Sequence, residues 1–433
     1  MNRVPEFLVE VFQNQYLPLG THEVSAVVSV TATDLASMAD APAATAAEII
    51  IVDCSGSMSA PITKLIQARQ ATAAAIDVIR DGTAFAVVAG ARQAWALYPS
   101  DRTMAIADAR TKKAAKDAVS KLTAHDGTAI GQWLRAARQL FLTRDDGLRH
   151  AILLTDGQDA HESADQLAAA IKLCMGVFTC DCRGVGTDWE VAELRKISTA
   201  LLGTVDIVAD PTGLTADFEA LMIAAMAKQV ADVGLRVWTP QHAKVRFVKQ
   251  VAPTVEDLTG MRRQVTSLIG DYPTGAWGAG ESRDYHVCVD VQPAVREMLA
   301  ARVSLIHETE SGEQNLGQGL VKAIWTEDVA MSTRINRHVA HYSGQAELAQ
   351  AILDGLEADR AGDRVRAEDR LGRAVALAHE SGNVESARLL ADVVDVINPA
   401  TGTVRLKARI LDADKMALDT RSTKTVRVKK TAE

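Results

Sequence analysis

Residues 48–57 read EIIIVDCSGS, a run of aliphatic side chains that ends in an acidic residue followed by two serines. A continuous apolar run of this kind is typical of a strand that is covered on both faces. Further apolar runs, such as AILLT at 151–155, alternate with stretches of helical spacing up to about residue 231. This alternation predicts a doubly wound, mostly parallel α/β sheet, Rossmann-like in architecture, over residues 46–231.

Short stretches of alternating apolar and polar residues lie on both sides of this region. Two precede it, at 7–13 and 22–32, and five follow residue 232: LRVWT, AKVRFVKQV, DYHVCVDVQ, ARVSLIH and QGLVKAIWT. Such strands, with glycine and proline between them, favour an antiparallel sandwich. We expect residues 1–34 and 232–329 to form one β-sandwich into which the α/β domain is inserted. The stretch YPTGAWGAGES at 272–282 is expected to be a long connection between two strands, and the Ala/Pro-rich residues 39–48 a linker.

The last hundred residues change character twice. Residues 338–397 are rich in alanine and leucine at helical spacing and predict a small helical region, divided by Gly362 and Gly382. Residues 398–433 hold nine Lys/Arg against four Asp/Glu and are expected to form a basic tail.

Two interpretations of this tail stay open. It is either a solvated terminus or a phosphoacceptor and docking segment, in which three threonines lie among basic residues. A competing hypothesis is that an aspartate of the tail folds back as an internal ligand of a metal. The threonines are Thr420, Thr423 and Thr425, and the aspartates are Asp412, Asp414 and Asp419.

Composition excludes several classes of function. The 433 residues carry a net charge of −8 and contain no stretch long and apolar enough to cross a bilayer. The amino terminus lacks the features of a signal peptide, which predicts a cytoplasmic protein without a membrane partner. The tail has a net charge of +5, so the rest of the chain carries −13, which disfavours binding to nucleic acid. Cys174, Cys180 and Cys182 lack the paired spacing of zinc ligands, so the cysteines are expected to be buried apolar residues.

Five oxygen-bearing side chains follow the predicted strands. Asp53, Ser55 and Ser57 come directly after the first strand, Thr128 opens a later helix, and Asp156 follows AILLT. Ligands of parallel sheets bind outside the carboxyl ends of the strands, where these residues are expected to meet. Oxygen ligands suit a hard divalent cation, and a shell rich in neutral hydroxyls leaves that cation able to attract a further carboxylate. The alternative is that Ser55 or Ser57 merely caps the helix that follows.

The order Asp-x-Ser-x-Ser, a distant threonine and a later aspartate resembles the metal-ion-dependent adhesion site of the von Willebrand factor A family. This resemblance implies that Ser55, Ser57 and Thr128 contact Mg²⁺, or alternatively Mn²⁺, directly. It also implies that Asp53 and Asp156 act largely through water. The implied function is binding of a protein ligand that offers an Asp or Glu to the metal, rather than catalysis.

Weaker candidates lie beside this set. Asp126 and Asp159 are either partners of the metal ligands or solvated loop carboxylates, and His125 is expected to be a surface residue of a loop. No nucleophile with a recognisable base appears, nor a Gly-x-x-x-x-Gly-Lys phosphate loop.

The layout of the whole chain resembles cytoplasmic von Willebrand A proteins of actinobacterial type. That resemblance implies partners in Ser/Thr kinase signalling, including a Ser/Thr kinase or a forkhead-associated domain protein that reads the tail. An alternative is an accessory subunit that delivers substrates to an AAA+ ATPase. A metal-dependent hydrolase ranks last, because the chain offers no candidate base.

Overall fold

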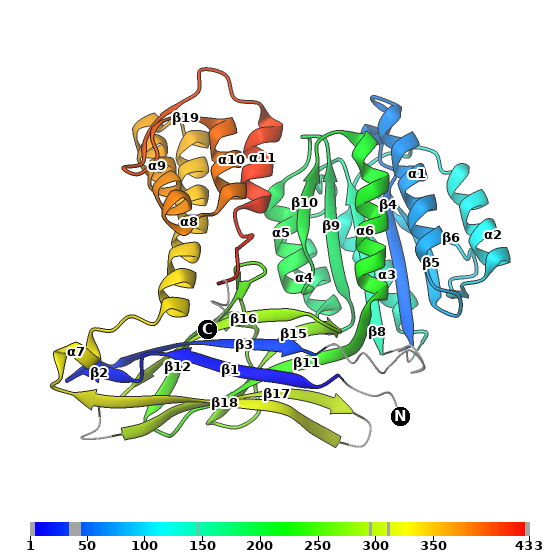
Figure 1. The fold of residues 1–433 in the computed structure, drawn as a ribbon. Coiled ribbons are helices and arrows are strands. Elements are labelled where there is room, and N and C mark those ends of the chain that lie inside the picture. Colours follow the sequence, from blue (N-terminus) through cyan, green and yellow to red (C-terminus); the bar gives the residue numbers. More distant parts are fainter. Residues whose placement is uncertain (1–4, 34–44, 145–146, 294–296, 310–311, 429–433) are drawn as a thin grey trace. The chain divides into compact units, whose positions relative to one another are not determined.

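The computed structural model describes residues 5–33, 45–144, 147–293, 297–309 and 312–428 (Figure 1). The chain forms two compact units: one contains the described residues 45–231, and the other those of 5–33 and 232–428. The second unit is therefore interrupted in sequence by the first. This confirms the predicted fold class, an α/β domain inserted into an antiparallel sandwich and followed by helices. Residues 39–44 of the expected linker lie outside the described ranges.

The first unit is built on a mostly parallel sheet in the order β10-β9-β8-β4-β5-β6, with β7 beside β5. All eight residues of the central strand β4 are buried, as its aliphatic sequence predicts. β4 pairs in parallel with β5 and β8, whereas β6 is an antiparallel edge strand. The strands are β4 (Ala46–Asp53), β5 (Ala84–Gly90), β6 (Ala94–Tyr98), β7 (Ala105–Ile106), β8 (Leu148–Thr155), β9 (Thr179–Val185) and β10 (Val205–Val208).

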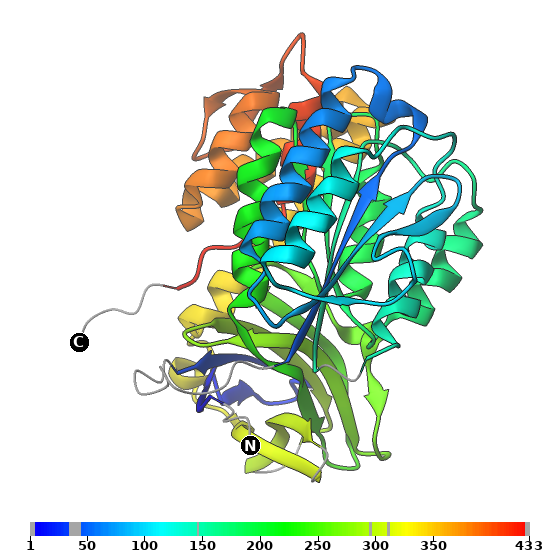
Figure 2. The same cartoon turned by 90° about the vertical axis from the view of Figure 1, so that its right-hand side faces the viewer.

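Helices cover both faces of this sheet (Figure 2). One face packs against α1 (Thr63–Val78), α2 (Ala109–Ser120) and α6 (Leu214–Met226) in a core of aliphatic side chains. The other face carries α3 (Ile130–Phe141), α4 (Ala164–Cys174) and α5 (Val191–Ala200). Trp133 of α3 lies so close to the sheet that a Cβ at Gly90 would be 2.4 Å from its ring. Only glycine allows this packing, which fixes α3 and the loop that precedes it.

Two sheets form the sandwich of the second unit in the described ranges, in the orders β1-β3-β16-β12-β13 and β14-β15-β11-β17-β18-β2. The amino-terminal strand β3 pairs with β16, so residues on both sides of the inserted α/β unit contribute to one sheet. The strands are β1 (Phe7–Gln13), β2 (Tyr16–Pro18), β3 (Glu23–Ala32), β11 (Lys228–Trp238), β12 (Ala243–Ala252), β13 (Glu256–Asp257), β14 (Arg263–Gln264), β15 (Ile269–Gly278), β16 (Ser282–Val291), β17 (Glu297–Thr309) and β18 (Gly312–Thr326).

Strand β15 corrects one expectation. The YPTGAWG sequence was expected to lie in a connection, but it forms most of this strand, and both Tyr272 and Trp277 are buried. The Arg283 guanidinium stacks over the Trp277 ring at 4.2 Å, and Phe7 meets the same ring edge-on. Gly275 has a φ of 75°, a left-handed backbone conformation that interrupts the regular strand geometry and that glycine adopts readily. Glycine and proline therefore mark an irregular strand here rather than a loop.

The helical region is larger than the sequence predicted. It contains α7 (Val329–Ser332), α8 (Arg337–Arg360), α9 (Arg364–Ser381), α10 (Val384–Val393), the hairpin β19 (Val394–Asn398) with β20 (Thr403–Leu406), and α11 (Asp412–Arg421). Leu406 and Leu418 join one apolar cluster with Leu371 and Leu390. The prediction of a basic tail from residue 398 is thus wrong, because apolar residues between the charges fold this segment onto the helices. No helix in the described ranges has the length and apolar character needed to span a membrane.

The residues that the tail hypotheses used are held in this fold. Thr420 is buried and donates its hydroxyl to the carbonyl oxygen of Met416 at 2.9 Å. Thr425 donates to the carbonyl oxygen of Val251 at 2.7 Å, which fastens the chain after α11 to β12. Asp419 is buried and pairs with Arg360 at 2.6 Å. Asp412 and Asp414 open the first turn of α11.

Asp284 of β16 anchors the last described residues. Its buried carboxylate accepts hydrogen bonds from Ser29 at 2.6 Å, from the Tyr342 hydroxyl, and from Arg427 at 2.6 and 3.0 Å. Burial raises the pKa of Asp284, but the hydrogen bonds and the charge of Arg427 outweigh burial, and the pKa is lowered overall. The carboxylate therefore depends on the cation that arrives with the carboxyl-terminal segment.

We expect Arg427→Ala to destabilise the protein by about 2 kcal/mol, because it leaves a buried carboxylate without its counter-charge. Urea denaturation measures this change. The exposed Arg366 provides the control, and Arg366→Ala should shift stability by less than about 0.5 kcal/mol. If the two variants are equally stable, Arg427 does not stabilise the fold through Asp284.

Candidate metal centre

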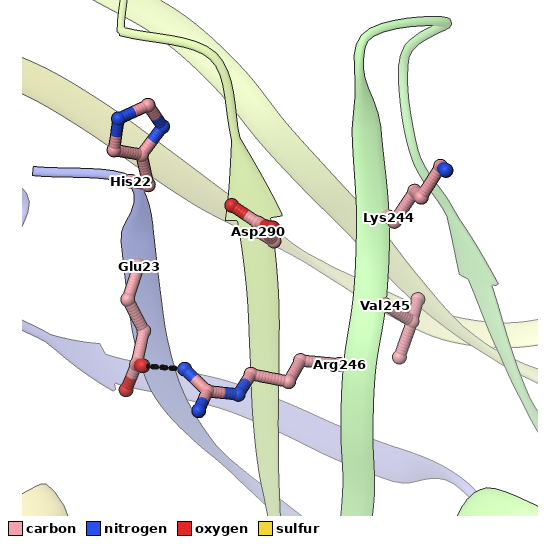
Figure 3. Close-up of a pocket in the computed structure, with 6 residues that line it drawn as sticks. All are labelled: His22, Glu23, Lys244, Val245, Arg246 and Asp290. Carbon is pink, nitrogen blue, oxygen red and sulfur yellow. Dashed lines mark hydrogen bonds and ion pairs between the residues drawn. The ribbon is translucent and has the colours of Figure 1, made fainter.

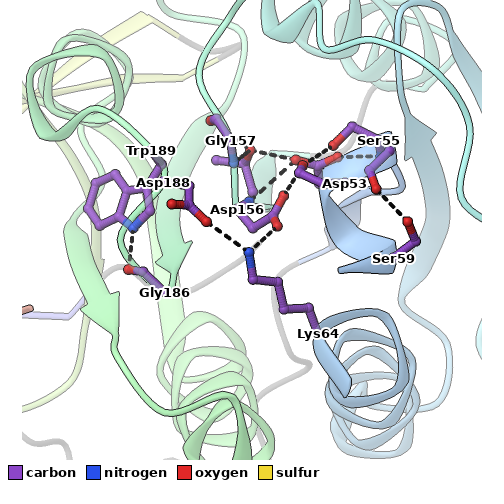
Figure 4. A network of polar contacts seen from close by, with 12 residues as sticks. Asp53, Ser55, Ser59, Lys64, Asp156, Gly157, Gly186, Asp188 and Trp189 are labelled. Atoms are coloured by element: carbon purple, nitrogen blue, oxygen red, sulfur yellow. Dashed lines mark hydrogen bonds and ion pairs between the residues drawn. The ribbon is translucent and has the colours of Figure 1, made fainter. Parts of the chain in front are cut away.

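The five oxygen-bearing residues meet at the carboxyl end of the parallel sheet. Asp53 is the last residue of β4, Asp156 directly follows β8, and Thr128 stands just before α3. Ser55 and Ser57 belong to the turn into the short 3-10 helix η1 (Gly56–Ser59). The backbone N–H of Ser55 donates to Asp53 at 2.7 Å and folds the turn back over the strand end (Figure 4).

The hydroxyls of this set face one another. Ser55 Oγ and Ser57 Oγ are 2.9 Å apart, and Ser57 donates to Asp156 Oδ1 at 2.6 Å. A Cβ placed on Gly157 would lie 3.5 Å from Ser57 Oγ and 3.8 Å from Thr128 Oγ1. The missing side chain of Gly157 therefore leaves space into which the oxygens of all three segments converge. An all-oxygen donor set of hydroxyls and carboxylates fits a hard divalent cation.

Burial differs across the set. Asp53, Ser55 and Asp156 are at most 1% exposed, whereas Ser57 is exposed. Burial raises the pKa of the Asp53 carboxyl to about 6, although hydrogen bonds from Thr155 and Ser55 oppose the shift. A buried carboxylate without a cation is unfavourable, so the site favours a positive charge, and the exposed side leaves it open to a ligand.

The helix-capping alternative does not describe these serines. Ser55 is the residue before η1, yet its side chain makes no capping hydrogen bond. Helix α1 begins after Ile62, which has no capping side chain either. The two serine hydroxyls instead interact with each other and with Asp156.

The structure adds residues that the sequence analysis missed. Thr155 donates its hydroxyl to Asp53 Oδ2 at 2.6 Å. His161 accepts the Thr128 backbone N–H on Nδ1 at 3.0 Å, which places its proton on Nε2. Lys64 of α1 donates to Asp156 at 2.8 Å and to Asp188 at 3.1 Å. The position of Thr155 at the end of a predicted strand could have indicated its role. Nothing in the sequence links Lys64 to Asp156, which is 92 residues away.

The weaker candidates do not join the five. The side chains of His125 and Asp126 are exposed, and the ring of His125 meets Trp95 edge-on. Asp159 is half-buried, and its backbone N–H donates to Glu193 at 3.1 Å. Burial raises the pKa of the Asp159 carboxyl to about 7, assisted by the negative charges of Glu162 and Glu193. The cysteines behave as expected: all five are buried and none forms a disulfide.

Among the hollows that the described residues line, two contain charged side chains outside the five-residue site. The first, of about 390 Å³, is on the sandwich, where Glu23 pairs with Arg246 and where His22, Lys244 and Asp290 complete a mixed set of charges (Figure 3). The second, of about 510 Å³, lies in the α/β unit, and its lining includes His161, Arg92 and Arg135. His161 connects this second hollow to the Thr128 loop.

Comparisons with known proteins agree with this geometry. A family model described as von Willebrand factor type A domain matches residues 47–207, and one described as von Willebrand factor type A C-terminal domain matches residues 376–422. The chain is 49% identical to a structure of von Willebrand factor type A from Catenulispora acidiphila, with 99% of this chain and 98% of that chain covered and a TM-score of 0.93.

A second structure, the ArnB paralog VWA2 from Sulfolobus acidocaldarius, shares 12% identity over 97% of this chain and 98% of that one. Its TM-score of 0.60 indicates a similar fold alone. No curated protein matches the chain.

Proposed function

Because the chain belongs to the von Willebrand factor type A family, we propose that it is a cytoplasmic, metal-dependent protein-binding adaptor and not an enzyme. The observation that carries this proposal is the convergence of Ser55, Ser57 and Thr128 between two buried carboxylates. Domains of this family commonly bind protein ligands through a divalent metal.

In this proposal, Ser55, Ser57 and Thr128 hold Mg²⁺ through neutral hydroxyls, and Mn²⁺ is an acceptable substitute. Asp53 and Asp156 hold the ion largely through water, and Thr155 orients Asp53 by its 2.6 Å hydrogen bond. When bound, the cation supplies a positive charge that attracts a carboxylate. The exposed side of the site at Ser57 then accepts an Asp or Glu of the partner protein.

The fold of the carboxyl-terminal segment argues against a direct role of its threonines in kinase signalling. Thr420 is buried and Thr425 is hydrogen-bonded to β12, so a kinase or a forkhead-associated domain would have to displace folded structure to read them. The metal centre, rather than the tail, is therefore the proposed partner site. Identification of the captured partner distinguishes a signalling protein from an AAA+ ATPase.

Affinity capture with the full chain tests the proposal. The partner should be retained in Mg²⁺, released by EDTA, and absent from the Ser55→Ala Ser57→Ala variant. Ser59→Ala is the matched control, since the Ser59 hydroxyl is exposed and bonds only to the carbonyl of Gly56 within the described residues. A partner that is retained equally in EDTA and by the double variant would refute metal-dependent binding.

A further inference from the structure

Lys64 is a buried cation placed against the metal centre. It lies in the first turn of α1, and only 6% of it is exposed. Its Nζ donates to Asp156 Oδ2 at 2.8 Å and to Asp188 Oδ2 at 3.1 Å (Figure 4). Asp156 is fully buried, whereas the side chain of Asp188 is 69% exposed. Lys64 is thus a buried, direct partner of one proposed metal ligand.

The two carboxylate oxygens of Asp156 accept hydrogen bonds from different partners. Oδ1 accepts the Ser57 hydroxyl at 2.6 Å and faces the hydroxyl cluster. Oδ2 accepts the ammonium of Lys64. The carboxylate is therefore fixed at both ends before any metal arrives, and only one of its oxygens faces the cluster.

The charges of the buried groups follow from these contacts. Asp53 and Asp156 contribute two negative charges, and Lys64 contributes one positive charge that neutralises one of them. The exposed carboxylate of Asp188 has a weaker electrostatic effect on the site, because solvent screens its charge. A divalent cation would therefore meet a site with one net buried negative charge, and it would keep one positive charge unbalanced.

We propose that Lys64 determines the ligand specificity of this site: it weakens binding of the divalent cation alone and keeps the bound cation attractive to an acidic ligand. This inference rests on the proposed function. The metal and the partner's carboxylate would then bind as a pair, because each supplies charge that the other lacks. A site without Lys64 would hold its metal more firmly and its acidic ligand less firmly.

The opposite directions of these two effects separate this role from simple positioning. If Lys64 only held Asp156 in place, its loss would weaken binding of both the metal and the carboxylate. If it acts through its charge, its loss strengthens the first and weakens the second. A unit charge a few ångströms from a divalent cation at an effective dielectric constant of about 20 is large enough for an effect on the order of tenfold.

The test uses the full chain with Mn²⁺ alone, followed by electron paramagnetic resonance, and then acetate as the carboxylate probe, followed by water-proton relaxation. Lys64→Gln should bind Mn²⁺ about tenfold more tightly than the wild type and acetate several-fold more weakly. Lys196→Gln is the matched control, since it removes the same charge from an exposed position of α5 and should leave both affinities unchanged.

Loss of Lys64 leaves Asp156 without its cationic partner and lowers stability in the absence of metal. A thermal denaturation series therefore accompanies the titration: the rise in Tm caused by Mn²⁺ should be larger for Lys64→Gln, and for a second variant, Lys64→Met, than for the wild type. An equal or smaller rise overturns the proposal even where the metal-free variants are partly unfolded.

The remaining outcomes are also decisive. Weaker or unchanged Mn²⁺ binding in Lys64→Gln, or acetate binding that does not fall, overturns the role of Lys64 while the metal site itself stands. A wild type whose Mn²⁺ binding is absent, or equal to that of Ser55→Ala Ser57→Ala, overturns the proposed function and this inference with it.

Discussion

His150→Leu is expected to lower the free energy of unfolding of the α/β unit by about 3 kcal/mol, because it removes the cation between a buried and a half-buried carboxylate. His150 of β8 contacts Glu48 of β4 at 2.7 Å through Nδ1 and Asp181 of β9 at 3.0 Å through Nε2. The side chain of Glu48 is 2% exposed and that of Asp181 17% exposed. Without His150, two acidic groups on neighbouring sides of one strand would share a site that water reaches poorly.

The same network predicts a dependence of stability on pH. Burial by itself lowers the pKa of His150, but Glu48 and Asp181 outweigh it and raise the pKa from 6.5 to about 10. The charged form of His150 is therefore favoured in the folded state. Its contribution to stability is fully present below about pH 6.5 and is lost as the pH rises through about 10. We expect wild-type stability to fall over this range.

Urea denaturation at several pH values measures both effects. The fall in stability between about pH 6.5 and 10 should be smaller in His150→Leu, since that variant has no imidazolium to lose. His125→Leu is the control, because the exposed His125 lies in a loop without a carboxylate contact among the described residues. Equal stability of His150→Leu and His125→Leu would be inconsistent with a charged network.

Asp53→Ala is expected to weaken Mg²⁺ binding by about 100-fold or more, because it removes the carboxylate that the turn and Thr155 orient toward the hydroxyl cluster. The variant should remain folded, since β4 is held by aliphatic contacts on both faces. Titration calorimetry measures the affinity, and circular dichroism checks the fold.

Asp126→Ala is the matched control for this titration. It removes a carboxylate from the Thr128 loop, but the side chain of Asp126 is exposed and stands outside the five-residue set. We expect its Mg²⁺ affinity to stay within about twofold of the wild type. If Asp53→Ala binds Mg²⁺ as tightly as Asp126→Ala, the assignment of Asp53 is wrong.

The sequence predicted the α/β unit well because its signal is local and repeated. The aliphatic run of β4 specifies a doubly covered strand, and a polar set at the strand ends must meet if the strands are parallel. Asp53, Ser55, Ser57, Thr128 and Asp156 were therefore recoverable from order and spacing, and the structure brings them together.

What the sequence did not predict depends on contacts between distant residues. Lys64 reads as an ordinary helix residue, and only the folded position of Asp156 gives it a role. Basic composition suggested a solvated tail, although Leu406 and Leu418 are buried in the helical cluster. Trp277 is buried in β15 although glycine and proline surround it in sequence. Composition records the residues present, but not which face of an element they occupy.

Anomalous diffraction from crystals of the full chain soaked in Mn²⁺ tests the metal centre most directly. We expect an anomalous peak at about 2.0–2.3 Å from the hydroxyl oxygens of Ser55, Ser57 and Thr128, with density for water between the peak and Asp53 and Asp156. Crystals of Ser55→Ala Ser57→Ala should lack this peak. A wild-type crystal with no peak at these oxygens, at Mn²⁺ concentrations that label other carboxylates of the molecule, would contradict a metal-dependent site at the end of β4.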